Sequence, residues 1–272
     1  MIVTLTDKQI QTVTSLINEA HTEGYEAGFK KGYEIGFKDG YEASLGTIPV
    51  DTKDTEILYP IHGCIPDISS FQTNVDFDKL CNNSDFVIIR ARFCTKTDAT
   101  FEKRAQELNN RNMPFAVYDY ATLMSHGNAK QQAEAIFNLC NKYHPSVYYI
   151  DTEQLGTGVT RGNEMDYIKT YVNRLRELGV EKIGQYTGDW LYSTYYKRIQ
   201  DLFDTLWIAS YGSNNGTYDG VKLQSEQYTD KIDLHQFTDK GTLPGIATKG
   251  DLSRLTGKKP LSWFTGRSYK QN

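Results

Sequence analysis

The chain has 272 residues, of which 39% are hydrophobic, which is enough for one large domain or two smaller ones with a real core. Its formal net charge of -4 argues against nucleic acid as a partner, because binding to phosphates needs a basic face. No apolar stretch approaches the ~18 residues of a membrane span, and the first ten residues lack the pattern of a signal peptide. We therefore expect synthesis in the cytoplasm and no stable membrane insertion.

Residues 1–45 form a different kind of sequence from the rest. Thr6-Asp7-Lys8-Gln9 is a capping box, which predicts the start of a helix. A glycine followed by an aromatic residue then recurs every four positions, at Gly24, Gly28, Gly32, Gly36 and Gly40. Each glycine costs a helix about 1 kcal/mol, so the segment is either partly disordered or packed closely against another helix. The regular spacing favours close packing and predicts a tether or a homo-oligomer formed through residues 6–45.

Residues 46–60 have the composition of a linker, and residues 61–272 alternate apolar runs with helical patterns. The expected strands are 64–68, 86–91, 115–120, 147–152, 182–186, 206–211 and 232–237. The expected helices are 100–112, 129–143, 164–178 and 190–200. Repeated βα units of this kind predict an α/β fold, a TIM-like (β/α) barrel. Its length is slightly short for a full barrel, so we expect reduced helices.

The most informative chemical signal is Asp151-Thr152-Glu153, which follows the apolar run 147–150. Side chains of a strand alternate between its two faces, so both carboxylates project to one side with their backbones about 7 Å apart. Two carboxylates this close resist joint ionisation, which raises the pKa of one of them. A neutral acid beside an ionised carboxylate is the pair that glycoside hydrolysis needs.

Further polar and aromatic residues stand at the expected carboxyl ends of strands, which meet at one end of a parallel barrel. Asp67 ends the first strand, and Asp251 lies near the expected closing strand. Each of these two acids is equally well explained as the cap of a helix or turn, but together with Asp151 and Glu153 they form an acidic cleft. The candidate substrate-binding residues are Tyr118, Tyr120, Tyr186, Trp207, Tyr211 and Gln236.

The four cysteines show no metal-ligand spacing, so we predict neither a metal site nor another cofactor. We interpret them as buried thiols. Cys64 and Cys94 lie near the ends of two neighbouring expected strands, where a disulfide is the alternative interpretation.

From about residue 63 to residue 257, the chain resembles the family 25 glycoside hydrolases, the lysozymes common among bacteriophage endolysins. Asp151-Thr152-Glu153 matches the signature Asp-x-Glu of that family, and the other similar segments occur in the family's order. These segments are 66–72, 86–91, 116–121, 183–187, 206–211, 234–237, 245–246 and 250–252. Two positions depart from the pattern: Asp119 stands where His is usual, and Leu234-His235-Gln236-Phe237 stands where Trp-Gln-Tyr is usual. Family 18 chitinases are less similar, because their motif needs further Asp residues where this chain has Ser146 and Tyr149.

The resemblance implies that the protein cleaves the β-1,4 bond between N-acetylmuramic acid and N-acetylglucosamine in bacterial peptidoglycan. It implies that Glu153 is the general acid and that Asp151 stabilises the transition state or the substrate's acetamide group. Asp67 and Asp251 would orient Asp151, the acetamide or a water molecule. The enzyme would reach the cell wall after lysis or as part of a virion.

Two other functions remain open at this stage. The first is a non-catalytic protein that binds glycans or cell walls and has kept the barrel, although retention of all four acids argues against it. The second is a virion structural protein that carries the barrel as a module, with residues 1–45 as its assembly element.

Overall fold

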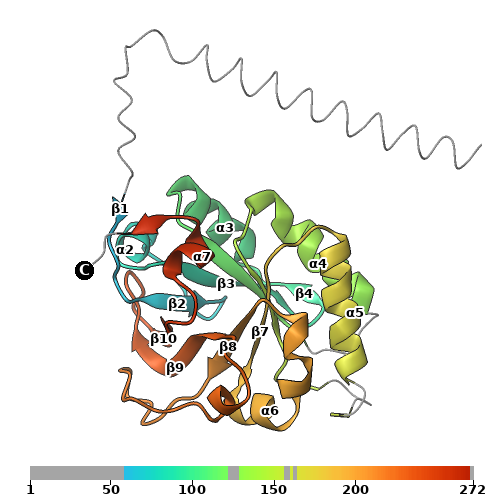
Figure 1. The fold of residues 1–272 in the computed structure, drawn as a ribbon. Coiled ribbons are helices and arrows are strands. Elements are labelled where there is room, and N and C mark those ends of the chain that lie inside the picture. Colours follow the sequence, from blue (N-terminus) through green and yellow to red (C-terminus); the bar gives the residue numbers. More distant parts are fainter. Residues whose placement is uncertain (1–57, 122–128, 156–159, 162–163, 270–272) are drawn as a thin grey trace, which may run out of the picture. The chain divides into compact units, whose positions relative to one another are not determined.

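The computed structural model describes residues 58–121, 129–155, 160–161 and 164–269 (Figure 1). The predicted helix of residues 1–45 and most of the predicted linker, residues 46–57, lie outside these ranges. Within them, no helix combines the length and the apolar character that crossing a membrane requires.

Eight strands close into a barrel around a packed interior. In chain order they are β2 (Ile65–Ile68), β3 (Val87–Phe93), β5 (Phe115–Tyr120), β6 (Tyr148–Asp151), β7 (Ile183–Gly188), β8 (Thr205–Ala209), β9 (Ile232–Thr242) and β10 (Lys249–Leu255). The strand β2 pairs with β3 on one side and with β10 on the other, which closes the ring. The seven expected strands are confirmed as β2, β3, β5, β6, β7, β8 and β9.

Six α-helices lie in the described ranges, and three of them are reduced to five or six residues, as the length of the chain predicts. They are α2 (Phe77–Asn82), α3 (Phe101–Asn110), α4 (Ala129–Cys140), α5 (Glu164–Glu177), α6 (Asp189–Thr194) and α7 (Leu261–Thr265). The expected helix 190–200 is confirmed in its first half, as α6; after Thr194 the chain continues as the 3₁₀ segment Tyr196–Leu202. Three two-residue strands complete the described fold: β1 (Leu58–Tyr59) pairs with β11 (Ser268–Tyr269), and β4 (Lys96–Thr97) pairs with β3.

The strands separate two hydrophobic cores, because their side chains alternate between the two faces of the sheet. Inside the barrel, Ile88, Ala116, Tyr149 and Trp207 belong to one cluster. Outside it, the intervening residues of the same strands pack against the buried faces of α3, α4 and α5. A residue's place in the alternation therefore decides whether it faces the barrel interior or the helices.

The last strand departs from the expected repeat. β10 runs antiparallel to both β9 and β2, whereas the other neighbouring pairs in the ring are parallel. It returns from β9 as a hairpin with no helix between them. The suggestion that Asp251 caps a turn at 252–255 is therefore wrong, because these residues continue the strand.

The structure contains no disulfide between Cys64 and Cys94. Cys64 comes just before β2, and Cys94 comes just after β3. Since β2 and β3 are parallel neighbours, the two residues lie at opposite ends of the strands. Burial raises the pKa of the Cys64 thiol to about 11, in keeping with a partly buried, unreactive thiol.

Candidate active site

The four predicted acids gather at one end of the barrel. Asp151 is the last residue of β6, and Glu153 follows two positions later. Asp67 in β2 lies directly opposite Asp251 in β10. Because β10 is antiparallel, its first residues lie at the end of the barrel where the parallel strands finish. Like charges directly opposite each other destabilise a sheet, so this pair of acids is a sign of function rather than of stability.

Burial raises the pKa of all four carboxyl groups. Asp67 and Asp151 are 4% and 3% exposed, and burial raises their pKa well above the ordinary range of an aspartate. Their neighbours add to the shift: Asp251 and Glu153 raise the pKa of Asp67, and Glu153 raises that of Asp151. Burial also raises the pKa of Glu153, and it raises that of Asp251 to about 6.

No lysine, arginine or histidine within the described ranges forms an ion pair with any of these four acids. Because no cation balances them, repulsion among the four carboxylates is relieved only when some of them bind a proton. Such a cluster holds a proton at a pH where an exposed carboxyl group has lost it, which is the property that a general acid needs.

A chain of hydrogen bonds links Asp67 to two of the predicted tyrosines. The side-chain amide of Gln236 donates to Asp67 over 2.9 Å. The oxygen of that amide accepts hydrogen bonds from the hydroxyls of Tyr186 and Tyr211, at 2.7 and 2.5 Å. Gln236 therefore fixes the orientation of one acid and two phenol groups at once. The structure brings these four predicted site residues together.

The main chain of the Asp151-Thr152-Glu153 segment is held from behind. The carbonyl oxygen of Thr152 accepts a hydrogen bond from Tyr196, and that of Glu153 accepts one from Arg161, at 2.9 and 3.0 Å. The guanidinium of Arg161 also donates to Tyr196 and pairs with the buried Glu164. This Arg161 network lies next to the carboxylates without contacting them through side chains, so it positions the acids.

The other predicted aromatic residues take different places. Trp207 is 1% exposed and lies inside the barrel, where its ring packs against Tyr118, Tyr149 and Tyr186. Trp207 therefore packs under Tyr118 and Tyr186 from inside the barrel and holds them in place. Tyr118 is half-buried beside it, and Tyr120 is half-buried at the end of β5, where its hydroxyl donates to Gln154 over 2.7 Å.

Asp119 and His235, which belong to the two departures from the family pattern, face away from the acid cluster. Asp119 points outward from β5 and accepts a hydrogen bond from Tyr171 of α5 over 3.0 Å. Its pKa rises to about 6 because it is fully buried, although the charge of Arg92 opposes the shift. His235 contacts the backbone oxygen of Ser210 and the ring of Tyr218, whereas the adjacent Gln236 faces the cleft.

Sequence reasoning missed Arg161, Tyr196 and a group of aromatic residues beside Tyr120. Arg161 and Tyr196 are 35 residues apart in the chain, and neither stands in a recognisable motif. The available signal is weak: Arg161 lies eight positions after Glu153, near the expected start of a helix.

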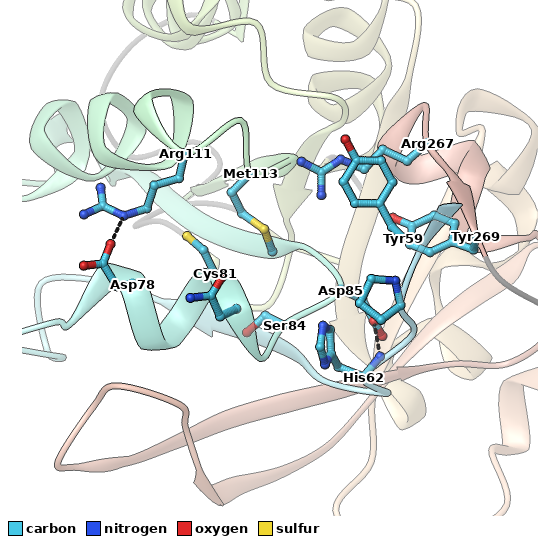
Figure 2. Close-up of a pocket in the computed structure, with 12 residues that line it drawn as sticks. Tyr59, His62, Asp78, Cys81, Ser84, Asp85, Arg111, Met113, Arg267 and Tyr269 are labelled. Atoms are coloured by element: carbon cyan, nitrogen blue, oxygen red, sulfur yellow. Dashed lines mark hydrogen bonds and ion pairs between the residues drawn. The ribbon is translucent and has the colours of Figure 1, made fainter. Parts of the chain in front are cut away.

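A separate cavity of about 260 Å³ lies at the opposite end of the barrel (Figure 2). Its lining residues His62, Asp85 and Met113 come shortly before β2, β3 and β5. Asp85 accepts a hydrogen bond from the backbone N–H of His62 at 2.6 Å. The Arg111 guanidinium pairs with Asp78 at 2.7 Å on another wall. Asp78 is thus paired with a cation, in contrast to the four acids of the cluster.

Comparison with known proteins agrees with the geometry. Residues 66–246 match the model of the glycosyl hydrolases family 25. The structure is similar to the catalytic domain of the endolysin Ply40 from bacteriophage P40 of Listeria monocytogenes, with 26% sequence identity and a TM-score of 0.66. That match covers 76% of this chain and 98% of the endolysin domain.

Two further solved structures have the same fold. The glycosyl hydrolase 25 GHIP of Streptococcus pneumoniae is 25% identical with a TM-score of 0.63, covering 73% of this chain and 88% of that chain. A muramidase from Trichobolus zukalii is 22% identical with a TM-score of 0.57, covering 75% of this chain and 99% of that chain. No curated protein sequence matches this chain.

Proposed function

The chain belongs to the glycosyl hydrolases family 25 and is a glycoside hydrolase of the lysozyme class, and we propose that it cleaves the β-1,4 bond from N-acetylmuramic acid to N-acetylglucosamine in bacterial peptidoglycan. The observation that carries this proposal is the cluster of four carboxyl groups with raised pKa and no cationic partner within the described ranges. A resemblance to muramidases and a phage endolysin supports the choice of bond and polymer.

Glu153 is the general acid in this proposal. It is the more exposed member of the Asp151–Glu153 pair, so a glycosidic oxygen can reach it, and burial keeps its proton on at a higher pH than usual. Protonation of the leaving oxygen breaks the bond to the sugar, and positive charge develops on the ring that remains. A water molecule, either directly or after attack by the substrate's acetamide oxygen, then adds to the ring carbon that lost the bond and gives up a proton to a carboxylate of the cluster.

Asp151 stabilises that developing charge. It is buried beside Glu153 and accepts a hydrogen bond from the Glu153 backbone N–H over 3.3 Å, so its place relative to the general acid is fixed. The charge of Glu153 raises the pKa of Asp151, so the two groups resist joint ionisation. In the form that reacts, Glu153 holds the proton and Asp151 carries the charge that faces the sugar. Asp67, held by Gln236, and Asp251 orient Asp151, the substrate's acetamide or a water molecule.

The substitution Glu153→Gln tests the proposal, because it removes the acidic proton and keeps the size of the side chain. We expect the variant to lose at least about 10²-fold in the rate at which it clears a suspension of Gram-positive cell walls. Its thermal unfolding should match that of the wild type. Glu181→Gln, an exposed carboxyl group beside the opposite end of the barrel, is the matched control and should clear walls normally. Wall clearance by Glu153→Gln at the wild-type rate contradicts the assignment.

A further inference from the structure

A β-bulge places Phe93 on the cleft side of the barrel. In the pairing of β3 with β5, Arg90 lies opposite Tyr118, but Arg92 lies opposite Asp119 and Phe93 opposite Tyr120, so β3 contains one extra residue between Arg90 and Arg92. Without it, the alternation would turn Phe93 away from the face that Arg90 and Tyr120 share. Bulges next to active sites often redirect a side chain in this way.

The redirected ring belongs to a layered group of four side chains, which we call the aromatic platform: Phe71, Arg90, Phe93 and Tyr120. Phe93 stacks on Tyr120 with 5.0 Å between ring centroids and 17° between ring planes. The guanidinium carbon of Arg90 lies 5.1 Å from the ring centroid of Phe71 and 5.1 Å from that of Phe93. Arg90 thus joins Phe71 to the stacked pair through two cation–π contacts.

The platform is held rigidly by its surroundings. Arg90 donates to Asp98 and to Ser70, both at 2.8 Å, so its charge is already neutralised and it acts as a packing layer. The turn that carries Phe71 is fixed by the buried Arg104, which donates to the backbone oxygens of Ser69 and Gln72 on either side of Phe71.

Despite this order, the platform leaves apolar surface in water. Phe71 is 75% exposed and Phe93 is 44% exposed. Isolated exposed apolar side chains are common, but an ordered stack of rings next to a catalytic cleft loses little conformational entropy when a ligand covers it. The arrangement is therefore suited to binding.

The platform is continuous with the acid pair. Phe93 lies opposite Tyr120, and Tyr120 lies opposite Asp151, so the three residues form a row across β3, β5 and β6. Strands are spaced by about 4.8 Å, which puts the backbone of Phe93 roughly 10 Å from that of Asp151. A polymer bound at the acid pair can reach the platform within a few repeat units.

We propose that the aromatic platform binds sugar rings of the glycan strand away from the bond that is cleaved. The C–H faces of pyranose rings are apolar and pack on aromatic rings, whereas the neutralised Arg90 offers no free charge to an anionic ligand. This inference rests on the proposed function for its choice of polymer, and it assigns Phe71 and Phe93 a role in binding and none in bond cleavage.

The test uses peptide-free glycan strands of alternating N-acetylglucosamine and N-acetylmuramic acid. Full-length Glu153→Gln protein, which leaves the strands intact, is compared with the same protein carrying Phe71→Ala and Phe93→Ala. We expect the Kd measured by calorimetry to rise roughly tenfold. In the active protein, the same two substitutions should raise KM by a similar factor and leave kcat within about twofold.

Matched variants separate ring stacking from general surface effects. Phe71→Tyr with Phe93→Tyr should keep the affinity, and Phe71→Leu with Phe93→Leu should lose it. Tyr228→Ala removes another exposed ring with a cation above it, four residues before β9 begins, and should leave the Kd unchanged. An unchanged Kd for the alanine pair overturns the inference. It would do so even if the platform binds a protein partner instead, because the rings would then not bind the glycan.

The outcomes also separate this inference from the proposed function. If the wild-type protein releases no sugar reducing ends, the proposed cleavage is wrong. If the same protein binds glycan strands more weakly after Phe71→Ala and Phe93→Ala, the platform still binds sugar. If instead the wild-type protein cleaves the strands, and the variant with Phe71→Ala and Phe93→Ala binds them as tightly, the proposed cleavage is supported and the proposed role of the platform is wrong.

Discussion

The two ends of the barrel differ in how their acidic residues are balanced. At the end where the parallel strands finish, Asp67, Asp151, Glu153 and Asp251 lie together, and charges within the cluster add to burial in raising the pKa of the three aspartates. At the opposite end, acids are balanced singly: Asp233 pairs with Lys259 at 2.8 Å, and Asp85 accepts a backbone hydrogen bond at 2.6 Å.

Burial alone therefore does not distinguish the active end. Burial raises the pKa of Asp85 and of Asp233 as well. What differs is the set of neighbouring charges: the four acids of the cluster lie beside one another and form no ion pair within the described ranges, whereas Asp233 pairs with a lysine. A cluster of like charges costs stability, so its retention is the physical mark of function.

The largest expected effect compares one substitution at both ends. Asp251→Asn should lower kcat on peptidoglycan by about 10²-fold, because it removes a charge that sets the pKa of Asp67 and a group that orients the reacting centre. Asp85→Asn should leave kcat within about twofold. Measurement of released reducing ends checks both variants, and equal losses of activity would remove the distinction between the ends.

A smaller effect is expected at Arg161, which holds the Glu153 carbonyl from behind. Arg161→Ala should lower kcat about tenfold, because a shift of the acid by a fraction of an ångström weakens proton transfer. It should also lower the free energy of unfolding by roughly 1–3 kcal/mol, because the buried Glu164 loses its partner.

The double variant Arg161→Ala with Glu164→Gln separates these two effects. It removes the unpaired buried charge, so the melting temperature should recover while kcat stays low. Recovery of both would show that Arg161 acts through stability and not through the position of Glu153.

The smallest effect is expected at Asp119, on the outer face of β5. Its charge adds to the raised pKa of Asp151, so Asp119→Asn should lower that pKa. The acidic limb of the pH profile of kcat/KM, where Asp151 must ionise, should move to lower pH by less than about one unit. A limb that does not move would show that Asp119 is electrically separate from the cleft.

The same variant has a signature in stability. The pKa of Asp119 rises from 3.8 to about 6 in the fold, so the folded wild type binds the proton more tightly and loses stability as pH rises through this interval. The asparagine variant lacks this loss. Its free energy of unfolding relative to the wild type should therefore grow by about 3 kcal/mol between pH 3.5 and pH 7. Urea denaturation at several pH values measures it.

Local patterns predicted the fold well where each element carries its own signal. The apolar runs located the seven strands β2, β3, β5, β6, β7, β8 and β9, because buried parallel strands consist of continuous apolar segments. Asp67, Asp151 and Glu153 were found because they stand at the ends of such runs, and Asp251 was found because it lies near the expected closing strand. The antiparallel direction of β10 was not predicted, because a short strand of mixed polarity has the same pattern in either direction.

Contacts between distant residues account for the rest. The extra residue between Arg90 and Arg92 changes which way Phe93 points, and nothing in the local sequence marks it. The bonds from Arg161 and Tyr196 to the catalytic segment depend on how α5 and the segment after α6 meet that segment. The direction of Asp119 depends on such contacts too: the sequence showed that it departs from the family pattern, but not that it faces Tyr171 of α5.

The central claim is that the acid cluster cleaves one particular bond, and the identity of the new reducing end tests it most directly. Purified peptidoglycan is digested with the wild-type enzyme, the products are reduced with borohydride, and the fragments are analysed by mass spectrometry. The account predicts fragments that end in reduced N-acetylmuramic acid and are absent with Glu153→Gln. Fragments that end in reduced N-acetylglucosamine, or cleavage confined to the peptides, would contradict it.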